Sequence, residues 1–331
     1  MPLARLFTKS EKEKIWVLSL VISIAVFTGI CMHSAAPQNV LSALQESGMS
    51  IQYLLRSPDS SIAQKFLKGL QDMTLALLVS LLAMLTPLAI MYTMEDRWID
   101  GVDEKIAALL RDLSDSMSAG ISISQALIMT SKGQGFGILN EPLRKLAVRV
   151  SWGVPFTEAI RDFANSLGTP LSKRLEGIII EAYRCGGNVE EIFSTAAEHI
   201  SKLWELKRTR RGEVRPFMFT IYIAFFVFLI ITLIFAKILF PILSQMSSLA
   251  AMGAGGGTAG ATLTAISEAE VKFANIILFH AVILEGLVGG LVIGKTIRGR
   301  ITSGFLHALI MLIIGVVFYI LMFVAQLQFV W

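Results

Sequence analysis

Charge is scarce in this sequence. Of the 331 residues, 16% are Asp, Glu, Lys or Arg, whereas 54% are hydrophobic. Soluble domains are about one quarter charged, so this composition argues against an ordinary soluble protein and indicates an integral membrane protein. The net charge of +4 is small, and the positions of the charges are more informative than their sum.

Cysteine and histidine are also scarce. Cys31 and Cys185 fall in segments that we place on opposite sides of a membrane, so we expect no disulfide between them. No Cys/His spacing resembles a metal site, and the helical His199 has no nucleophile or carboxylate pair at useful spacing. We therefore predict no catalytic residue, no metal and no cofactor, and we do not expect an enzyme.

Long apolar runs are present instead, and each is about long enough to cross a bilayer. They lie at about 15–32, 73–94, 217–240, 273–293 and 305–330. Ser34-Ala35-Ala36 permits a signal-peptidase site, but the length of the first run and the spans that follow favour an uncleaved anchor. We expect an extracytoplasmic loop at 34–72 and a flexible, glycine-rich segment at 244–272.

Residues 95–215 form a different kind of segment, dense in charges of both signs. The two signs nearly balance, so no broad basic face for nucleic acid is expected. Apolar residues recur there at helical spacing in six segments, which predicts an antiparallel bundle of about six short helices. The positions expected to face the core are Ile106, Leu109, Leu110, Leu113, Met117, Ile123, Ala126, Leu127, Leu143, Leu146, Ala147, Val150, Phe156, Ala159, Ile160, Phe163, Leu167, Leu171, Leu175, Ile178, Ile179, Ala182, Val189, Phe193, Ala196, Ile200 and Leu203.

Start and stop signals separate these helices. Thr169-Pro170 is a cap followed by proline at the first helical position, and Asn140 is a second predicted cap. Asn188 with Glu191 forms a capping box. The glycines expected to end helices are Gly120, Gly153, Gly186 and Gly187.

The positions of the basic residues predict how the chain is oriented in the membrane. Segments 1–14 and 295–304 are basic, as is the membrane-proximal end of 95–215. The positive-inside rule places all three in the cytoplasm and the C-terminus outside. We therefore predict an all-α, multi-pass protein of the cytoplasmic membrane, with an N-terminal membrane part (1–94), a cytoplasmic bundle (95–215) and a C-terminal membrane part (216–331).

The segment from Gly289 to Thr296 satisfies the nucleotide-binding pattern G-x-x-x-x-G-K-[ST]. A working P-loop needs a strand before it and a soluble α/β core, whereas this match ends a run of about twenty apolar residues. Gly286, Gly290 and Gly294 are spaced by four, so we read them as a small-residue face for helix packing, within the chain or against a partner.

Glu285 lies in the middle of the same span. Intramembrane carboxylates are costly, so Glu285 is either a contact or proton-path residue, or a hydrogen-bonded packing residue. Where residues 95–215 meet the membrane, a basic cluster (Lys207, Arg208, Arg210 and Arg211) precedes Pro216, the expected bend before the third span. The cluster is expected to anchor to lipid headgroups, with an acidic protein partner as the alternative.

The bundle resembles a known family in three places. Leu109–Leu127, Trp152–Ile160 and Glu181–Ile192 resemble the opening, the repeated glycine turn and the closing turn of the type II secretion system protein F domain. The resemblance covers roughly residues 105–240. With one bundle, the chain is similar to the single-module proteins of Tad-like pili and archaeal type IV filaments. Many members carry Gly-Glu before the closing turn, where this sequence has Tyr183-Arg184.

This resemblance implies a platform for filament assembly in the cytoplasmic membrane. Its partners would be a hexameric secretion ATPase and pilin-like subunits, with a second copy or a related platform protein also plausible. The candidate coupling residues are Glu181, Arg184, Gly186, Gly187, Pro216 and the four residues of the basic cluster; Arg184 receives no role by analogy. The alternative function is a small-solute or ion transporter that uses Glu285.

Overall fold

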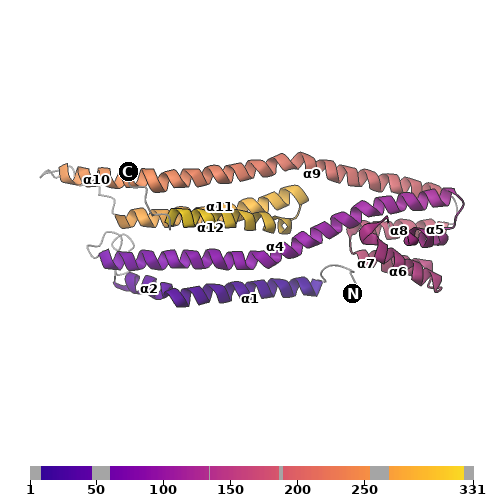
Figure 1. Cartoon of the computed structure of the whole chain (residues 1–331), viewed down its shortest axis with the longest axis horizontal. Coiled ribbons are helices and arrows are strands. Elements are labelled where there is room, and N and C mark those ends of the chain that lie inside the picture. Colours follow the sequence, from indigo (N-terminus) through magenta and orange to yellow (C-terminus); the bar gives the residue numbers. More distant parts are fainter. Residues whose placement is uncertain (1–8, 47–59, 134, 186–188, 254–267, 324–331) are drawn as a thin grey trace. The chain divides into compact units, whose positions relative to one another are not determined.

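The fold was analysed in a computed structural model of the chain (Figure 1), which describes residues 9–46, 60–133, 135–185, 189–253 and 268–323. Every regular element in these ranges is a helix, which confirms the all-α prediction. The elements in order are α1 (Lys9–Ser34), α2 (Ala36–Glu46), α4 (Ser60–Ser118), α5 (Ile123–Lys132), the 3₁₀ turn η1 (Gly137–Leu139), α6 (Asn140–Ser151), α7 (Phe156–Leu167), α8 (Pro170–Cys185), α9 (Val189–Ile234), the π-helical turn η2 (Phe235–Leu239), α10 (Phe240–Gly253), α11 (Glu268–Arg298), the 3₁₀ turn η3 (Ile301–Gly304) and α12 (Phe305–Phe323).

Two compact units share these helices. The first, here called the module, comprises residues 1–12 and 91–214, and the second, the membrane unit, comprises residues 13–90 and 215–331. Helices α4 and α9 each contribute residues to both units. The prediction of six short helices was therefore wrong for the first and last of them, which are parts of helices of 59 and 46 residues.

The reason lies in the sequence around residues 91–105 and 205–215. The first stretch contains no proline and one glycine, so nothing there breaks the helix where the apolar run gives way to charged residues. In α9 Pro216 removes one backbone donor, and the helix continues through it. The hydroxyl of Thr220 donates to the Pro216 carbonyl at 3.2 Å.

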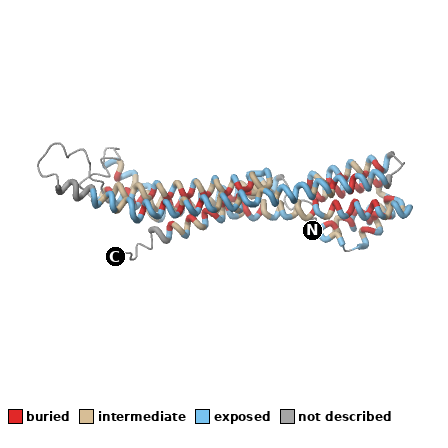
Figure 2. The backbone as a smooth tube through the Cα atoms, turned by 90° about the horizontal axis from the view of Figure 1, so that it is seen from above, coloured by how far each residue is buried: buried red, intermediate tan, exposed pale blue. Residues whose placement is uncertain are grey.

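The predicted core of the module is largely confirmed. A single cluster of buried residues joins α4 to α5, α6, α7, α8 and α9, and its least exposed members include Ile106, Leu109, Leu110 and Leu113. Figure 2 shows the buried positions recurring along one side of each helix. Leu203 is a wrong prediction, because it is 46% exposed and the buried stripe of α9 ends at Ile200. Val189 and Phe193 lie outside the residues whose burial is described.

The helix boundaries of the module follow the predicted signals closely. The Thr169 hydroxyl accepts the Ser172 amide (3.0 Å) and the Ser172 hydroxyl accepts the Thr169 amide (3.2 Å), so the two caps are reciprocal at the start of α8. Gly120 and Gly153 adopt φ of 80° and 85° just after α4 and α6. Gly186, Gly187 and Asn188 lie outside the described residues.

Asn140 is a correction to the predicted caps. It is the first residue of α6 with helical dihedrals, and the residue before it, Leu139, is the N-cap. Its side-chain oxygen accepts the amide of Phe136 at 3.1 Å, so Asn140 closes the short turn η1 that precedes the helix. A short polar side chain can either cap a helix or close a turn. Because a 3₁₀ turn precedes α6, the Asn140 side chain closes that turn.

The membrane unit contains the predicted apolar helices. Among the residues that the structure describes, five helical segments are long and apolar enough to span a bilayer: Ser10–Ser34, Ser61–Ser118, Ser194–Met246, Ala269–Arg298 and Ile301–Ile320. The segment expected to be a loop at 34–72 instead holds α2 and the beginning of α4. Likewise α10 extends to Gly253 within the stretch expected to be flexible, and residues 254–267 lie outside the description.

A π-helical turn interrupts the third apolar segment. In η2 the amide of Phe240 bonds to the carbonyl of Phe235, five residues back. Pro241 follows at once and has no amide to donate to the preceding turn, so the normal α-helical ladder is broken here. Proline chemistry therefore accounts for the position of this irregularity.

Candidate coupling and partner-binding residues

An aromatic contact joins the end of α8 to the start of α7. Tyr183, in the last turn of α8, stacks on Phe156 at the start of α7 with ring centroids 4.7 Å apart. Phe156 is buried and Tyr183 is 47% exposed. Tyr183 therefore has a packing role at the end of α8. The neighbouring Glu181 and Arg184 are both exposed on the surface of the module.

The basic cluster divides into two pairs. Lys207 donates to Asp103 at 2.8 Å, and Arg211 donates to Asp100 at 2.7 Å. Lys207 also lies 5.9 Å from the centre of the Trp204 ring, in reach of a cation–π contact. Arg208 and Arg210 are exposed. Lys207 and Arg211 therefore join α9 to α4 inside the module, and anchoring of the cluster to lipid headgroups stays a prediction.

Asp103 is the most buried of the four residues in the pairs Asp103–Lys207 and Asp100–Arg211, which are here called the ion-pair ladder. Its side chain is 7% exposed, and its second oxygen, Oδ1, is buried with no hydrogen-bond partner among the described residues. A carboxylate so placed depends on its one cation, because an uncompensated buried charge is strongly destabilising. Lys207 is 42% exposed, so solvent screens the pair in part.

Further contacts gather on the same stretch of α4. Glu95 pairs with Lys12 of α1 at 2.5 Å, and the Trp98 indole donates to the carbonyl of Leu167 at the end of α7 at 3.3 Å. Residues 95–103 of α4 thus hold α1, the α7–α8 turn and α9 by polar contacts. These contacts were not predicted. The matched spacings Asp100/Asp103 and Lys207/Arg211 were the available signal, but nothing local says that two helices a hundred residues apart are neighbours.

In the membrane unit the glycine face packs inside the chain. A Cβ added at Gly290 would lie 2.2 Å from the backbone of Ala308 in α12, and one at Gly294 would lie 2.0 Å from the backbone of Gly304. A Cβ added at Gly286 would lie 3.4 Å from the side chain of Met311 in α12 and 3.4 Å from that of Phe225 in α9. The face therefore allows α11 and α12 to form a tight hairpin, which decides the question that the sequence left open.

The intramembrane carboxylate is next to this face. The Oε2 atom of Glu285 is buried and has no hydrogen-bond partner in the part of the chain that the structure describes. His280 is engaged elsewhere, with Nδ1 at 2.8 Å from the Ile276 carbonyl and Nε2 at 3.4 Å from the Thr74 hydroxyl. Glu285 and His280 are thus not brought together by any described hydrogen bond.

The nucleotide-binding pattern falls entirely within α11. Residues 289–296 are α-helical, and the Thr296 hydroxyl donates to the Val292 carbonyl at 2.9 Å. Because Gly290 and Gly294 lie inside an α-helix, their amides donate to carbonyls of the preceding turn and are not free to cradle a phosphate. This geometry agrees with the packing interpretation of the glycines.

Comparisons with known proteins bear on residues 109–236, which match the family described as "Type II secretion system (T2SS), protein F". The chain is also 26% identical over 206 residues to the uncharacterized protein MJ1286 of Methanocaldococcus jannaschii. That alignment covers 62% of this chain but 31% of the relative, so this chain spans less than a third of its length. No solved structure matches the chain.

The matched residues begin within α4 and end within η2. They include most of the module core and the apolar part of α9, as the resemblance at residues 105–240 predicts. Residues 109–236 are thus similar to the type II secretion system protein F domain.

Proposed function

We propose that this protein is a non-enzymatic membrane platform on which a type IV pilus-like filament or a type II secretion pseudopilus is assembled. In this proposal the module binds a cytoplasmic hexameric secretion ATPase, and the membrane unit contacts pilin-like subunits. The observation that carries it is helix α9. It supplies Ala197 and Ile200 to the module core and Phe225 and Leu229 to the membrane-unit core, all within the matched family domain.

The proposal gives the ion-pair ladder a role in coupling. The pairs Asp103–Lys207 and Asp100–Arg211 join the two helices that lead from the module to the membrane unit. A load on the module is then shared by α4 and α9, whose continuous hydrogen-bonded backbones extend beyond Ile90 and Val214. The proposed orientation has the N-terminus and module in the cytoplasm and the C-terminus outside, in agreement with the positive-inside rule.

The direct test of partner choice uses the full chain in lipid nanodiscs and the purified secretion ATPase from the same cell. We expect saturable binding, and loss of surface filaments when the gene is deleted. Absence of binding together with normal filament assembly in the deletion strain would contradict the proposal.

A second candidate function, transport of an ion or small solute, is favoured only by Glu285. Its buried and unpartnered Oε2 is the kind of intramembrane group that marks a permeation path. Reconstituted protein should then conduct protons or cations, and Glu285→Gln should abolish the flux. Equal, background-level flux for wild type and variant would remove this candidate.

A further inference from the structure

Helix α6 exposes one face along its whole length, and the platform role does not account for it. This α6 face consists of Glu141, Arg144, Lys145, Val148, Arg149 and Trp152, which recur at helical spacing. Trp152 follows the last residue of the helix but stays in register, because its amide bonds to the Val148 carbonyl at 3.0 Å. On the opposite side of α6, Leu143, Leu146 and Ala147 are buried in the core.

Large side chains on the α6 face are unusually exposed. Trp152 is 81% exposed and Val148 is 41% exposed. Neither is needed for the module core, whose buried cluster omits both. Tryptophan and arginine are the residues most enriched at the energetic centres of protein interfaces, so their joint exposure on one helix face points to a protein contact.

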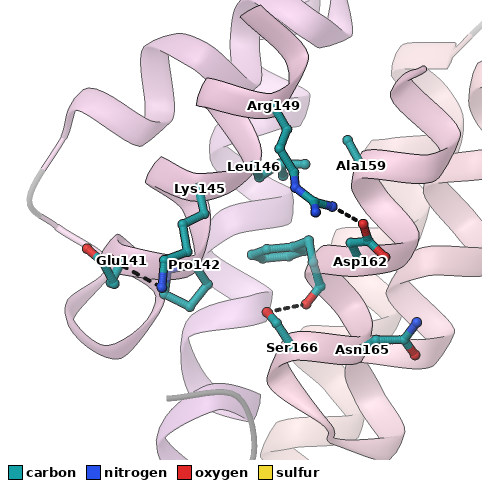
Figure 3. A pocket seen from close by; sticks show the side chains of 10 residues that line it. Glu141, Pro142, Lys145, Leu146, Arg149, Ala159, Asp162, Asn165 and Ser166 are labelled. Carbon is teal, nitrogen blue, oxygen red and sulfur yellow. Dashed lines mark hydrogen bonds and ion pairs between the residues drawn. The ribbon is translucent and has the colours of Figure 1, made fainter. Parts of the chain in front are cut away.

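Two hollows flank the face. One, of about 460 Å³, lies between α6 and α7 with Leu146, Ala159 and Phe163 on its apolar side (Figure 3). The other, of about 800 Å³, lies between α5 and α6 and is lined by Ile128, Ala147 and Val148. Hollows of this size are large enough to receive apolar side chains of a bound partner.

Charges at the rims are predominantly positive. Lys132, Arg144, Lys145 and Arg149 line the hollows together with two carboxylates, Glu141 and Asp162, so the rim carries a net charge of +2 (four minus two). Arg149 pairs with Asp162, while Arg144 and Lys145 share Glu141, at 2.8 and 3.4 Å. Figure 3 shows the Arg149 and Lys145 side chains along the first hollow.

Glu141 remains ionised in this setting. The hydrogen bond from Lys145 and the nearby Arg144 hold the pKa of its carboxyl below the ordinary value. The rim charge therefore stays at +2 around neutral pH.

We infer that the α6 face is a docking surface for an acidic, partly apolar segment of a partner protein, with apolar side chains in the two hollows and carboxylates against the rim cations. The inference rests on the proposed function, under which that segment belongs to the secretion ATPase, and it specifies which surface of the module is used.

The test measures binding of the purified ATPase to the full chain in nanodiscs. Two variants address the face, R144E/K145E and W152A, and all three side chains are exposed, so the fold should persist; circular dichroism checks this. The matched control is K173E/R174E, which makes the same charge change at exposed positions of α8. We expect each α6 variant to raise Kd at least tenfold, or about 1.4 kcal/mol, and the control to stay within about twofold.

Each contrary result has a separate meaning. Wild-type binding that R144E/K145E and W152A leave unchanged overturns the docking surface while the platform function stands. No binding by the wild-type chain overturns the docking surface, and together with normal filament assembly in the deletion strain it contradicts the platform function as well. A third arm uses phosphatidylglycerol vesicles without ATPase: co-sedimentation that R144E/K145E abolishes would assign the face to anionic lipid and overturn the protein-docking inference.

Discussion

At the scale of single residues, Asp103 and Lys207 are the most informative pair in the module. They join α4 to α9 across 104 positions of sequence, and the carboxylate is nearly buried whereas the ammonium is partly exposed. Such a pair contributes to stability mainly through the cost of breaking it, because removal of one partner leaves a buried charge without compensation.

Lys207→Met should therefore destabilise the module by about 1–3 kcal/mol, below the full cost for a wholly buried pair because solvent screens this one. Asp103→Asn in the same background should recover part of the loss, because a neutral amide needs no counter-charge. The measurement is denaturant unfolding of the full chain in detergent, followed by tryptophan fluorescence.

Arg208→Met is the matched control for Lys207→Met, since Arg208 is an exposed cation one residue away. Its effect should be within about 0.5 kcal/mol. Equal stability of Lys207→Met and Arg208→Met would show that the ladder does not hold the two helices together.

At the scale of elements, local patterns predicted the helices well and their partners poorly. The apolar stripes of the module and the reciprocal cap at Thr169 are readable because both depend on spacing within one helix. Leu203 continued the pattern in sequence, yet it is exposed because the bundle has no helix to cover it there. The continuity of α4 was missed because a change from apolar to charged composition looks like a boundary although the backbone need not break.

The α11–α12 hairpin likewise has a predictable sequence pattern but packing partners that the sequence does not identify. Glycines at every fourth position predict that another helix packs closely against α11. Only the tertiary structure identifies Ala308 and Gly304 as the residues that pack there. The backbone contact at Gly294 is so short that any side chain requires the two segments to separate.

Gly294→Ala should accordingly disrupt the hairpin, with a loss of stability of at least about 2 kcal/mol from overpacking against backbone. Thermal unfolding in detergent, combined with the yield of monodisperse protein, measures the effect. Gly29→Ala is the control, because Gly29 also lies in an apolar helix and a Cβ there meets nothing within 4 Å. Similar behaviour of the two variants would contradict the packing role of the glycine face.

At the scale of the whole molecule, the proposed function requires α4 and α9 to transmit a load from the module to the membrane unit. The match to the family domain takes in most of the module and the apolar part of α9, so the matched stretch joins bundle residues to an apolar helical segment. A docking site needs only the surface of the module. A coupling device needs, in addition, an unbroken mechanical connection, and the proposal distinguishes the two.

The decisive measurement is filament assembly in cells whose chain carries a short Gly-Ser insertion after Gly212 of α9. The control is the same insertion after Gly120, in the exposed turn between α4 and α5. We predict that the Gly212 insertion leaves the protein folded, inserted and able to bind the ATPase but stops filament assembly, whereas the control strain still makes filaments. Normal filament numbers with the Gly212 insertion would contradict coupling through α9 and leave the module as a docking site alone.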